Sequence, residues 1–280
     1  MDQGPNYDWT TIWSMLPKKA QESLVNPVAK AIGDGVGGIF TWVFHKPIEY
    51  MAVEQAKVES LKHMTAEKLS KIPENKMDFS KRGLMVKALE DSKYSLDNEL
   101  MREYFSTLIA KAANKDTANL VSPYFSTILS NMSVRDAKFL ERFKNTQSLA
   151  IVKIRFTDSK APKNFTDYKQ DYILNKNVNA KEENIEVYSE EIDALESLGV
   201  VKRKYGQINE SEADDIRSIF RHIKNKHLEK NLAGHFELEL NSDKKQEIFI
   251  NKHPYDTVQT IPGSLDLTEL GKSFVRMVLL

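Results

Sequence analysis

The chain has 280 residues, and its 40 Lys and Arg balance 40 Asp and Glu, so the formal net charge at pH 7 is zero. This balance gives no reason to expect a polyanionic partner. Hydrophobic residues make up 41% of the chain, enough to form a folded core. The absence of cysteine excludes disulfides, thiolate metal sites, iron–sulfur clusters and cysteine nucleophiles.

The first 44 residues are predicted to form two helices. Residues 8–16 place Trp9, Trp13 and two aliphatic side chains on one face of a short helix. The pair Asn26-Pro27 then starts a helix that runs to about Phe44. No secretory signal precedes them, and the most apolar window, residues 24–44, contains a proline and two charged residues. We therefore expect a cytoplasmic protein.

Small residues recur every four positions along the second of these helices, beside a stripe of large apolar residues. Glycine inside a helix costs about 1 kcal/mol relative to alanine, so several glycines indicate that another helix approaches closely. One interpretation is tight packing inside a helical bundle, which we favour for the resting state. The other is an element that oligomerises or associates with a membrane, because tryptophan favours bilayer interfaces. The candidate membrane or helix-association face consists of Trp9, Trp13, Ala29, Gly33, Gly37, Phe40, Thr41, Trp42 and Phe44.

Residues 48–145 are predicted to continue as helices joined by short connectors. A long helix is expected over residues 48–72, a shorter one over 84–89, and a central core helix over 100–113 with a broad apolar stripe. Ser122-Pro123 caps the next helix, and Ser133 with Asp136 forms a capping box for the last. Residues 1–145 are thus predicted to form an N-terminal helical bundle.

The pattern changes after residue 145. Strands are expected over 149–156, from 200, and over 265–267, with helices over 188–198, 211–232 and 269–280. A hairpin is expected from 235–240 and 247–251, whereas the polar tract 157–184 shows no clear period. The fold class is therefore mainly α, with a smaller α+β C-terminal domain over 146–280.

The order of elements in this domain is that of a winged helix with an insertion at about 206–262. Winged helices often bind DNA, but the helix that would enter the groove carries four acidic residues and no basic one. Such a helix would repel phosphates, so nucleic acid is not the expected partner. The candidate DNA contacts of this alternative are Lys202, Arg203 and Lys204.

The sequence contains no recognisable catalytic or metal-binding motif. The run Gly33–Gly38 matches G-x-G-x-x-G, but no buried strand leads into it. No two histidines have metal-ligand spacing, and no nucleophile elbow, phosphate loop or kinase motif occurs. We therefore predict no catalytic residues, no cofactor and no metal, although missing motifs do not exclude a novel hydrolase or nuclease.

Several segments resemble the abortive-infection-alpha family of bacterial proteins. The likeness lies in residues 26–33, 46–48, 67–74, 99–110, 121–125, 128–129, 133–140 and 265–274. The resemblance implies a bacterial protein of phage defence and implies no catalytic residues.

The first functional hypothesis is a non-enzymatic sensor or effector that acts through an unidentified host or phage protein. It includes homo-oligomerisation and peripheral association with the inner membrane as further options. The second hypothesis is a winged-helix regulator that binds nucleic acid.

Overall fold

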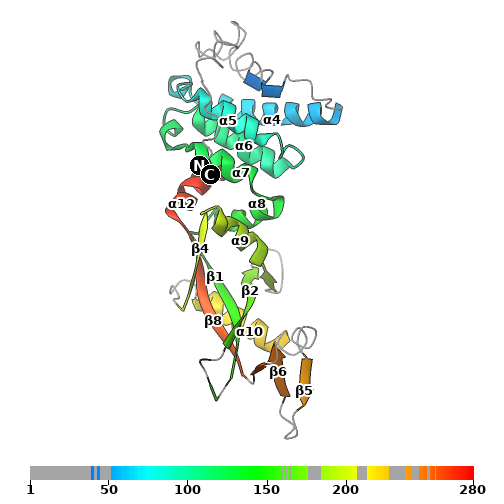
Figure 1. Ribbon diagram of the computed structural model, residues 1–280. Coiled ribbons are helices and arrows are strands. Elements are labelled where there is room, and N and C mark those ends of the chain that lie inside the picture. The colour runs from blue at the N-terminus through cyan, green and yellow to red at the C-terminus, as the bar shows by residue number, and fades with distance from the viewer. Residues whose placement is uncertain are drawn as a thin grey trace, which may run out of the picture. The chain divides into compact units, whose positions relative to one another are not determined.

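A computed structural model gives the arrangement of the chain as two compact units (Figure 1). The helical unit comprises Met1–Lys144 and Ser273–Leu280, and the sheet unit comprises Asn145–Lys272. The last residues thus cluster with the first unit, whereas the sequence analysis assigned 146–280 to one domain. The structure describes residues 39–40, 43–44, 52–158, 160–161, 163, 165–175, 184–206, 213–226, 237–240, 246–250, 253–255 and 257–280.

The described part of the helical unit follows the sequence prediction closely. Its helices are α4 (Ala52–Ser70), α5 (Arg82–Ser92), α6 (Glu99–Ala112), α7 (Pro123–Ser130), α8 (Val134–Leu140) and the end of α12 (Glu269–Val278). Short 3-10 turns lie at Glu74–Lys76, Ala118–Leu120 and Glu141–Phe143. Residues 39–40 and 43–44 are helical, as expected, and the rest of the two N-terminal helices lies outside the described residues.

Local capping explains where three of these helices begin. The Asn98 side chain accepts hydrogen bonds from two backbone amides of α6. Ser122 caps α7 and is followed by Pro123 at its first position. Ser133 accepts from the Asp136 amide, while the Asp136 carboxylate accepts from the Ser133 amide, so the predicted capping box is confirmed.

Helix α6 lies at the centre of the helical unit. It contacts α4, α5, α7 and α8, which is why its apolar stripe is so broad (Figure 1). The predicted core residues Phe105, Leu108, Phe125 and Ile128 are each at most 2% exposed, so that prediction is confirmed. The aromatic ring of Phe125 also meets that of Phe274 from α12, edge to face, at 5.7 Å.

The sheet unit is built on a five-stranded sheet with the order β3-β2-β1-β8-β4. Its strands are β1 (Ser148–Thr157), β2 (Phe165–Asn175), β3 (Asn184–Val187), β4 (Val201–Tyr205) and β8 (Thr257–Leu267). Helix α9 (Ser189–Ser197) contacts β2 and β4, and α10 (Ala213–Lys226) contacts β1, β2 and β3. A separate sheet joins β5 (Glu237–Leu240), β6 (Gln246–Ile250) and β7 (His253–Tyr255).

Two strands of the large sheet were not expected. Strands β2 and β3 lie in or beside the polar tract 157–184, and β8 begins at Thr257, well before residue 265. The reason is that β1 pairs with β8 over its whole length and with β2 on its other side, so cross-strand partners hold polar segments extended.

The elements of the predicted winged helix are present in the expected order. Helix α9 ends at Ser197, Gly199 just beyond it has a φ of 72°, and β4 then pairs antiparallel with β8. In this sheet, however, β8 also pairs with β1, and β1 with β2, so the hairpin is one edge of a wider sheet. The protein is mainly helical, and the winged-helix assignment stays a prediction.

Leu108→Ala tests the assignment of the core. Leu108 is 2% exposed on the central helix, so truncation should lower the free energy of unfolding by about 2–5 kcal/mol. Tyr94→Ala is the matched control, because Tyr94 is 92% exposed and its loss should change stability by less than about 0.5 kcal/mol. Equal melting temperatures for the two variants would contradict the central position of α6.

Candidate functional site

The structure describes only two residues of the predicted membrane or helix-association face. Phe40 is 3% exposed, and its ring stacks with that of the half-buried Phe44 at a centroid distance of 6.0 Å. The Lys93 ammonium lies over the Phe44 ring at 5.9 Å. The face as a whole therefore stays a prediction: Trp9, Trp13, Ala29, Gly33, Gly37, Thr41 and Trp42 lie outside the described residues.

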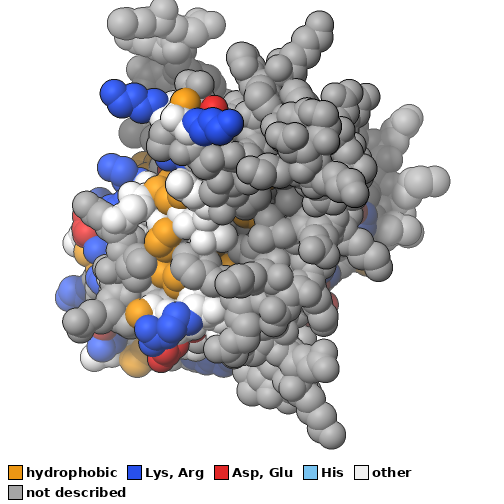
Figure 2. Space-filling view, turned by 90° about the horizontal axis from the view of Figure 1, so that it is seen from below, with side chains coloured by type: hydrophobic (Ala, Val, Ile, Leu, Met, Phe, Trp, Pro, Cys, Tyr) orange, Lys and Arg blue, Asp and Glu red, His pale blue; other side chains and the backbone are white. Residues whose placement is uncertain are grey.

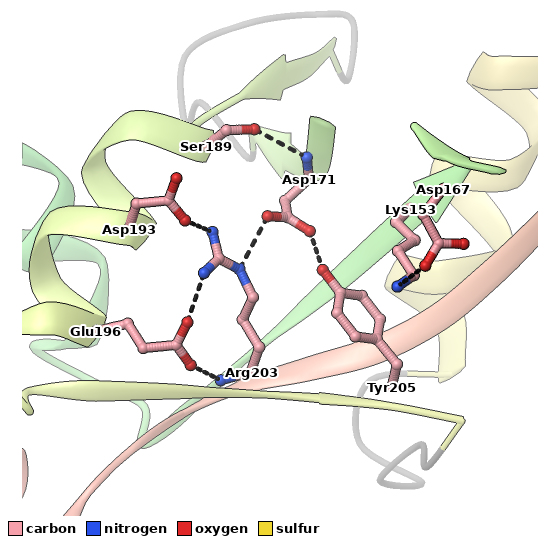
Figure 3. Close-up of polar contacts among 8 residues, drawn as sticks. All are labelled: Lys153, Asp167, Asp171, Ser189, Asp193, Glu196, Arg203 and Tyr205. Atoms are coloured by element: carbon pink, nitrogen blue, oxygen red, sulfur yellow. Dashed lines mark hydrogen bonds and ion pairs between the residues drawn. The ribbon is translucent and has the colours of Figure 1, made fainter. Parts of the chain in front are cut away.

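The most connected polar cluster in the described residues lies in the sheet unit (Figure 3). The register of β1, β8 and β4 places the odd-numbered residues of β1 on the same face of the sheet as Arg203 and Tyr205. Lys153 on β1 is the Cα partner of Asp171 on β2. We call the side chains gathered here the charged face: Lys153, Arg155, Asp167, Asp171, Arg203 and Tyr205.

Arg203 is held by carboxylates from two different elements. Its Nε donates to Asp171 of β2 at 2.9 Å, and its Nη2 donates to Asp193 of α9 at 2.6 Å. Glu196 of α9 binds both the guanidinium and, at 2.9 Å, the Arg203 backbone amide. The guanidinium thus fixes α9 to the sheet, and Glu196 satisfies an outward amide of the edge strand β4.

Tyr205 reaches across the sheet because β8 carries a glycine at the crossing point. Tyr205 on β4 and Gly263 on β8 are Cα partners. A Cβ on Gly263 would lie 2.8 Å from the Tyr205 ring and 2.4 Å from the Lys204 carbonyl oxygen, so any side chain there would force the strands apart. The ring instead lies 4.2 Å from the Lys153 ammonium, and its hydroxyl donates to Asp171.

The charged face continues along β1. Lys153 binds Asp167 at 2.7 Å, and the Arg155 guanidinium makes two hydrogen bonds to the same carboxylate. Arg155 also lies 3.8 Å over the ring of Phe165, which is 47% exposed. Positive and negative side chains therefore alternate from α9 to the far end of β2, and each described cation on this face has a carboxylate partner.

The electrostatics of this face are those of structural ion pairing. Burial by itself would lower the pKa of Arg203, but the charge of Asp171 and the hydrogen bonds that the guanidinium donates to Asp193 and Glu196 raise it above the ordinary value. Burial and the hydrogen bond to Asp171 raise the pKa of the Tyr205 phenol. The hydrogen bond from Arg155 lowers the pKa of Asp167. Each shift favours the protonation state that the ion pairs need, so the arrangement holds elements together.

The winged-helix alternative predicts that Arg203 contacts DNA, together with Lys202 and Lys204. The structure separates the three residues: Lys202 is exposed, Lys204 pairs with Asp266 at 2.6 Å, and Arg203 faces the carboxylates described above. A signal for this was present, because alternation along β4 puts Arg203 on the same face as the buried Val201. A cation on the buried face of a strand needs a carboxylate partner.

On the described part of the face in Figure 2, Lys and Arg side chains surround an area of apolar and uncharged side chains, and acidic side chains lie beside some of them. Among the residues that the structure describes, no three His, Asp or Glu side chains lie together so that they could hold a metal ion. In the same described parts of the chain, no helix is both long and apolar enough to cross a membrane.

The protein consists of a helical bundle and an α+β unit. The polar cluster of the α+β unit holds α9 on the sheet. The family model described as abortive infection alpha matches residues 53–278, which run through both units. The chain belongs to this family, as the sequence resemblance indicated. Comparison with curated proteins and with solved structures gave no significant match.

Arg203→Met tests whether the charged face holds the sheet unit together. The substitution leaves three carboxylates without their shared cation, and the Asp171 side chain is only 7% exposed. We expect a loss of about 1–3 kcal/mol in the free energy of unfolding. Arg203→Lys should recover part of this loss, since a lysine keeps the charge but not the planar fork. Lys202→Met on the same strand is the matched control and should be near neutral; a similar loss there would contradict the assignment.

Proposed function

We propose that this protein is a bacterial anti-phage defence protein that acts in abortive infection. The observation that carries the proposal is the family match over residues 53–278. The protein is proposed to work in the cytoplasm as a sensor or effector, through contacts with a host or phage protein and without catalysis. The described polar groups of the charged face pair with one another, so this cluster has a structural role. Such a role agrees with a protein that acts through contacts with other proteins.

A plaque assay tests this proposal. Cells that express the gene should show a lower plating efficiency for a susceptible phage than cells with an empty vector, and infected cells should die before progeny are released. Lys202→Met, a surface variant that should fold, is expected to retain protection, whereas Leu108→Ala should weaken it through loss of folded protein. No change in plating across a broad phage panel would contradict the defence role.

Peripheral association with the inner membrane is the second part of the proposal. Its support is the composition of residues 24–44, together with Trp9 and Trp13 nearby. The burial of Phe40 favours the interpretation that this region packs internally in the resting protein. We therefore propose that membrane association follows a trigger, and that homo-oligomerisation through the small-residue stripe accompanies it.

Liposome flotation tests the membrane step. Resting protein should stay in the aqueous fraction, and protein from phage-infected cells should float with vesicles that contain anionic phospholipid. Trp9→Ala with Trp13→Ala should abolish flotation, because tryptophan contributes strongly to interfacial binding. Phe40→Lys is unsuitable for this purpose, since a charge at a site 3% exposed would also unfold its surroundings. Protein that stays in the aqueous fraction after infection would contradict this step.

The alternative is a winged-helix regulator that binds nucleic acid. It is favoured by one observation, the order of α9, β4, β8 and α12 with β4 paired antiparallel to β8. Against it stand the zero net charge and the engagement of Arg203 and Lys204 by carboxylates.

A gel-shift titration with duplex DNA at two salt concentrations distinguishes the alternatives. We expect no sequence-specific complex at physiological salt, because the net charge is zero and α9, the helix that would enter the groove, carries four acidic residues and no basic one. Submicromolar binding that is weakened by Lys202→Met and by rising salt would favour the regulator and contradict our proposal. The unmodified protein with a competitor polyanion is the control for non-specific association.

A further inference from the structure

Helix α12 belongs to both compact units. It is one continuous helix over Glu269–Val278, and the division between the sheet unit and the helical unit falls between Lys272 and Ser273. Its first turn is therefore fixed in one unit and its remaining turns in the other. The chain also passes between the units at residues 144–145, but α12 is the only described helix that the division cuts.

Thr268 anchors the start of α12 to the turn between α9 and β4. Its backbone amide donates to the Val200 carbonyl at 3.0 Å, and its hydroxyl donates to the Gly199 carbonyl at 2.6 Å. The same hydroxyl accepts from the Gly271 amide at 2.9 Å, so one side chain caps the helix and fastens it to the turn.

Gly271 lets this helix start lie directly on the turn. A Cβ at Gly271 would lie 2.0 Å from the Val200 carbonyl oxygen, so only glycine permits this approach of backbone to backbone. Because the contact involves backbone on both sides, neither partner can move away by a change of rotamer. The backbone of Gly271 and that of Val200 can therefore pack against each other in only one way.

The far end of α12 is anchored by apolar packing in the helical unit. Phe274, Val275, Met277 and Val278 are each at most 4% exposed. The Phe274 ring meets Phe125 of α7 edge to face at 5.7 Å. Ser273, just before these buried positions, and Arg276, between them, are exposed, so the helix uses one face for the contact.

A helix of this length depends on its anchors. Isolated helices shorter than about 12 residues are marginal in water, because few hydrogen bonds offset the cost of nucleation. When one end of α12 loses its contacts, the hydrogen bonds of the next turn lose their support, and the loss propagates along the helix. A change that weakens the contacts at one end of α12 therefore also lowers the stability of the contacts at its other end.

We propose that α12 couples the two units energetically: a change at the turn of residues 199–200 loosens the packing of residues 274–278 in the helical unit. By reciprocity, a change at Phe274 loosens the turn in the sheet unit. The inference rests on the two anchors and does not depend on the proposed function.

Hydrogen–deuterium exchange of the full chain tests the coupling. Thr268→Val removes the hydroxyl but keeps the side-chain volume, and amides of residues 274–278 should exchange on the order of tenfold faster. Thr268→Ser retains the hydroxyl and should exchange like the unmodified protein. Ile219→Val is the control, because it removes a methylene from a site 0% exposed in the sheet unit, away from the anchor.

Unchanged exchange at residues 274–278 in Thr268→Val would overturn the proposal. So would an equal acceleration in Ile219→Val, since that would indicate general loss of stability and not coupling through α12.

The reciprocal experiment uses Phe274→Leu and monitors the amides of Val200 and Gly271 in the sheet unit. These amides should exchange faster in Phe274→Leu than in Val86→Ala, which changes a buried residue of α5 in the helical unit. If the two variants have equal exchange at Val200, the coupling does not exist. This arm also decides the matter if Thr268→Val fails to fold.

Discussion

The antiparallel ladder between β1 and β8 is the constraint on which the sheet unit depends. Ten consecutive residue pairs join the two strands, from Ser148 with Asp266 to Thr157 with Thr257. About a hundred residues lie between the strands in sequence, so the ladder closes a long loop whose entropy cost grows only slowly with length. Because Cα partners in such a ladder lie roughly 5 Å apart, the chain leaves the sheet unit beside the point where it entered.

The same ladder sets the charged face. Once β8 lies between β1 and β4, the pleat fixes which residues of the three strands share a side. Arg203 and Tyr205 then face Lys153, and Gly263 leaves room for the Tyr205 ring to cross β8. The ion pairs of Arg203 hold α9 on the sheet, and the end of α9 forms the turn on which Thr268 rests. The register of β1, β8 and β4 therefore determines where the ion pairs of Arg203 form. Those ion pairs in turn position the turn that Thr268 contacts.

The proposed function rests on family membership, and the structure describes the two units over which the family model extends. The abortive infection alpha model spans both units, and the polar cluster that joins α9 to the sheet has its groups satisfied internally. The proposed role as a sensor or effector needs a route from binding to response, and the proposed coupling through α12 supplies one. The defence role and the coupling through α12 are separate proposals, since one concerns cells and phage and the other a free energy within the chain.

Elements with local signals could be placed from the order of amino acids alone. Ser122-Pro123, the Ser133 capping box and Gly199 each act within one turn of chain, so helix ends could be placed without knowing any distant partner. The apolar stripe of α6 likewise indicated a central helix. Long-range pairing was needed to show that residues 165–175 form a strand and which three carboxylates bind Arg203. The tertiary structure also divided α12 between two units. These features depend on pairing between residues far apart in sequence, and the local pattern of polar and apolar residues does not record which segment lies beside which.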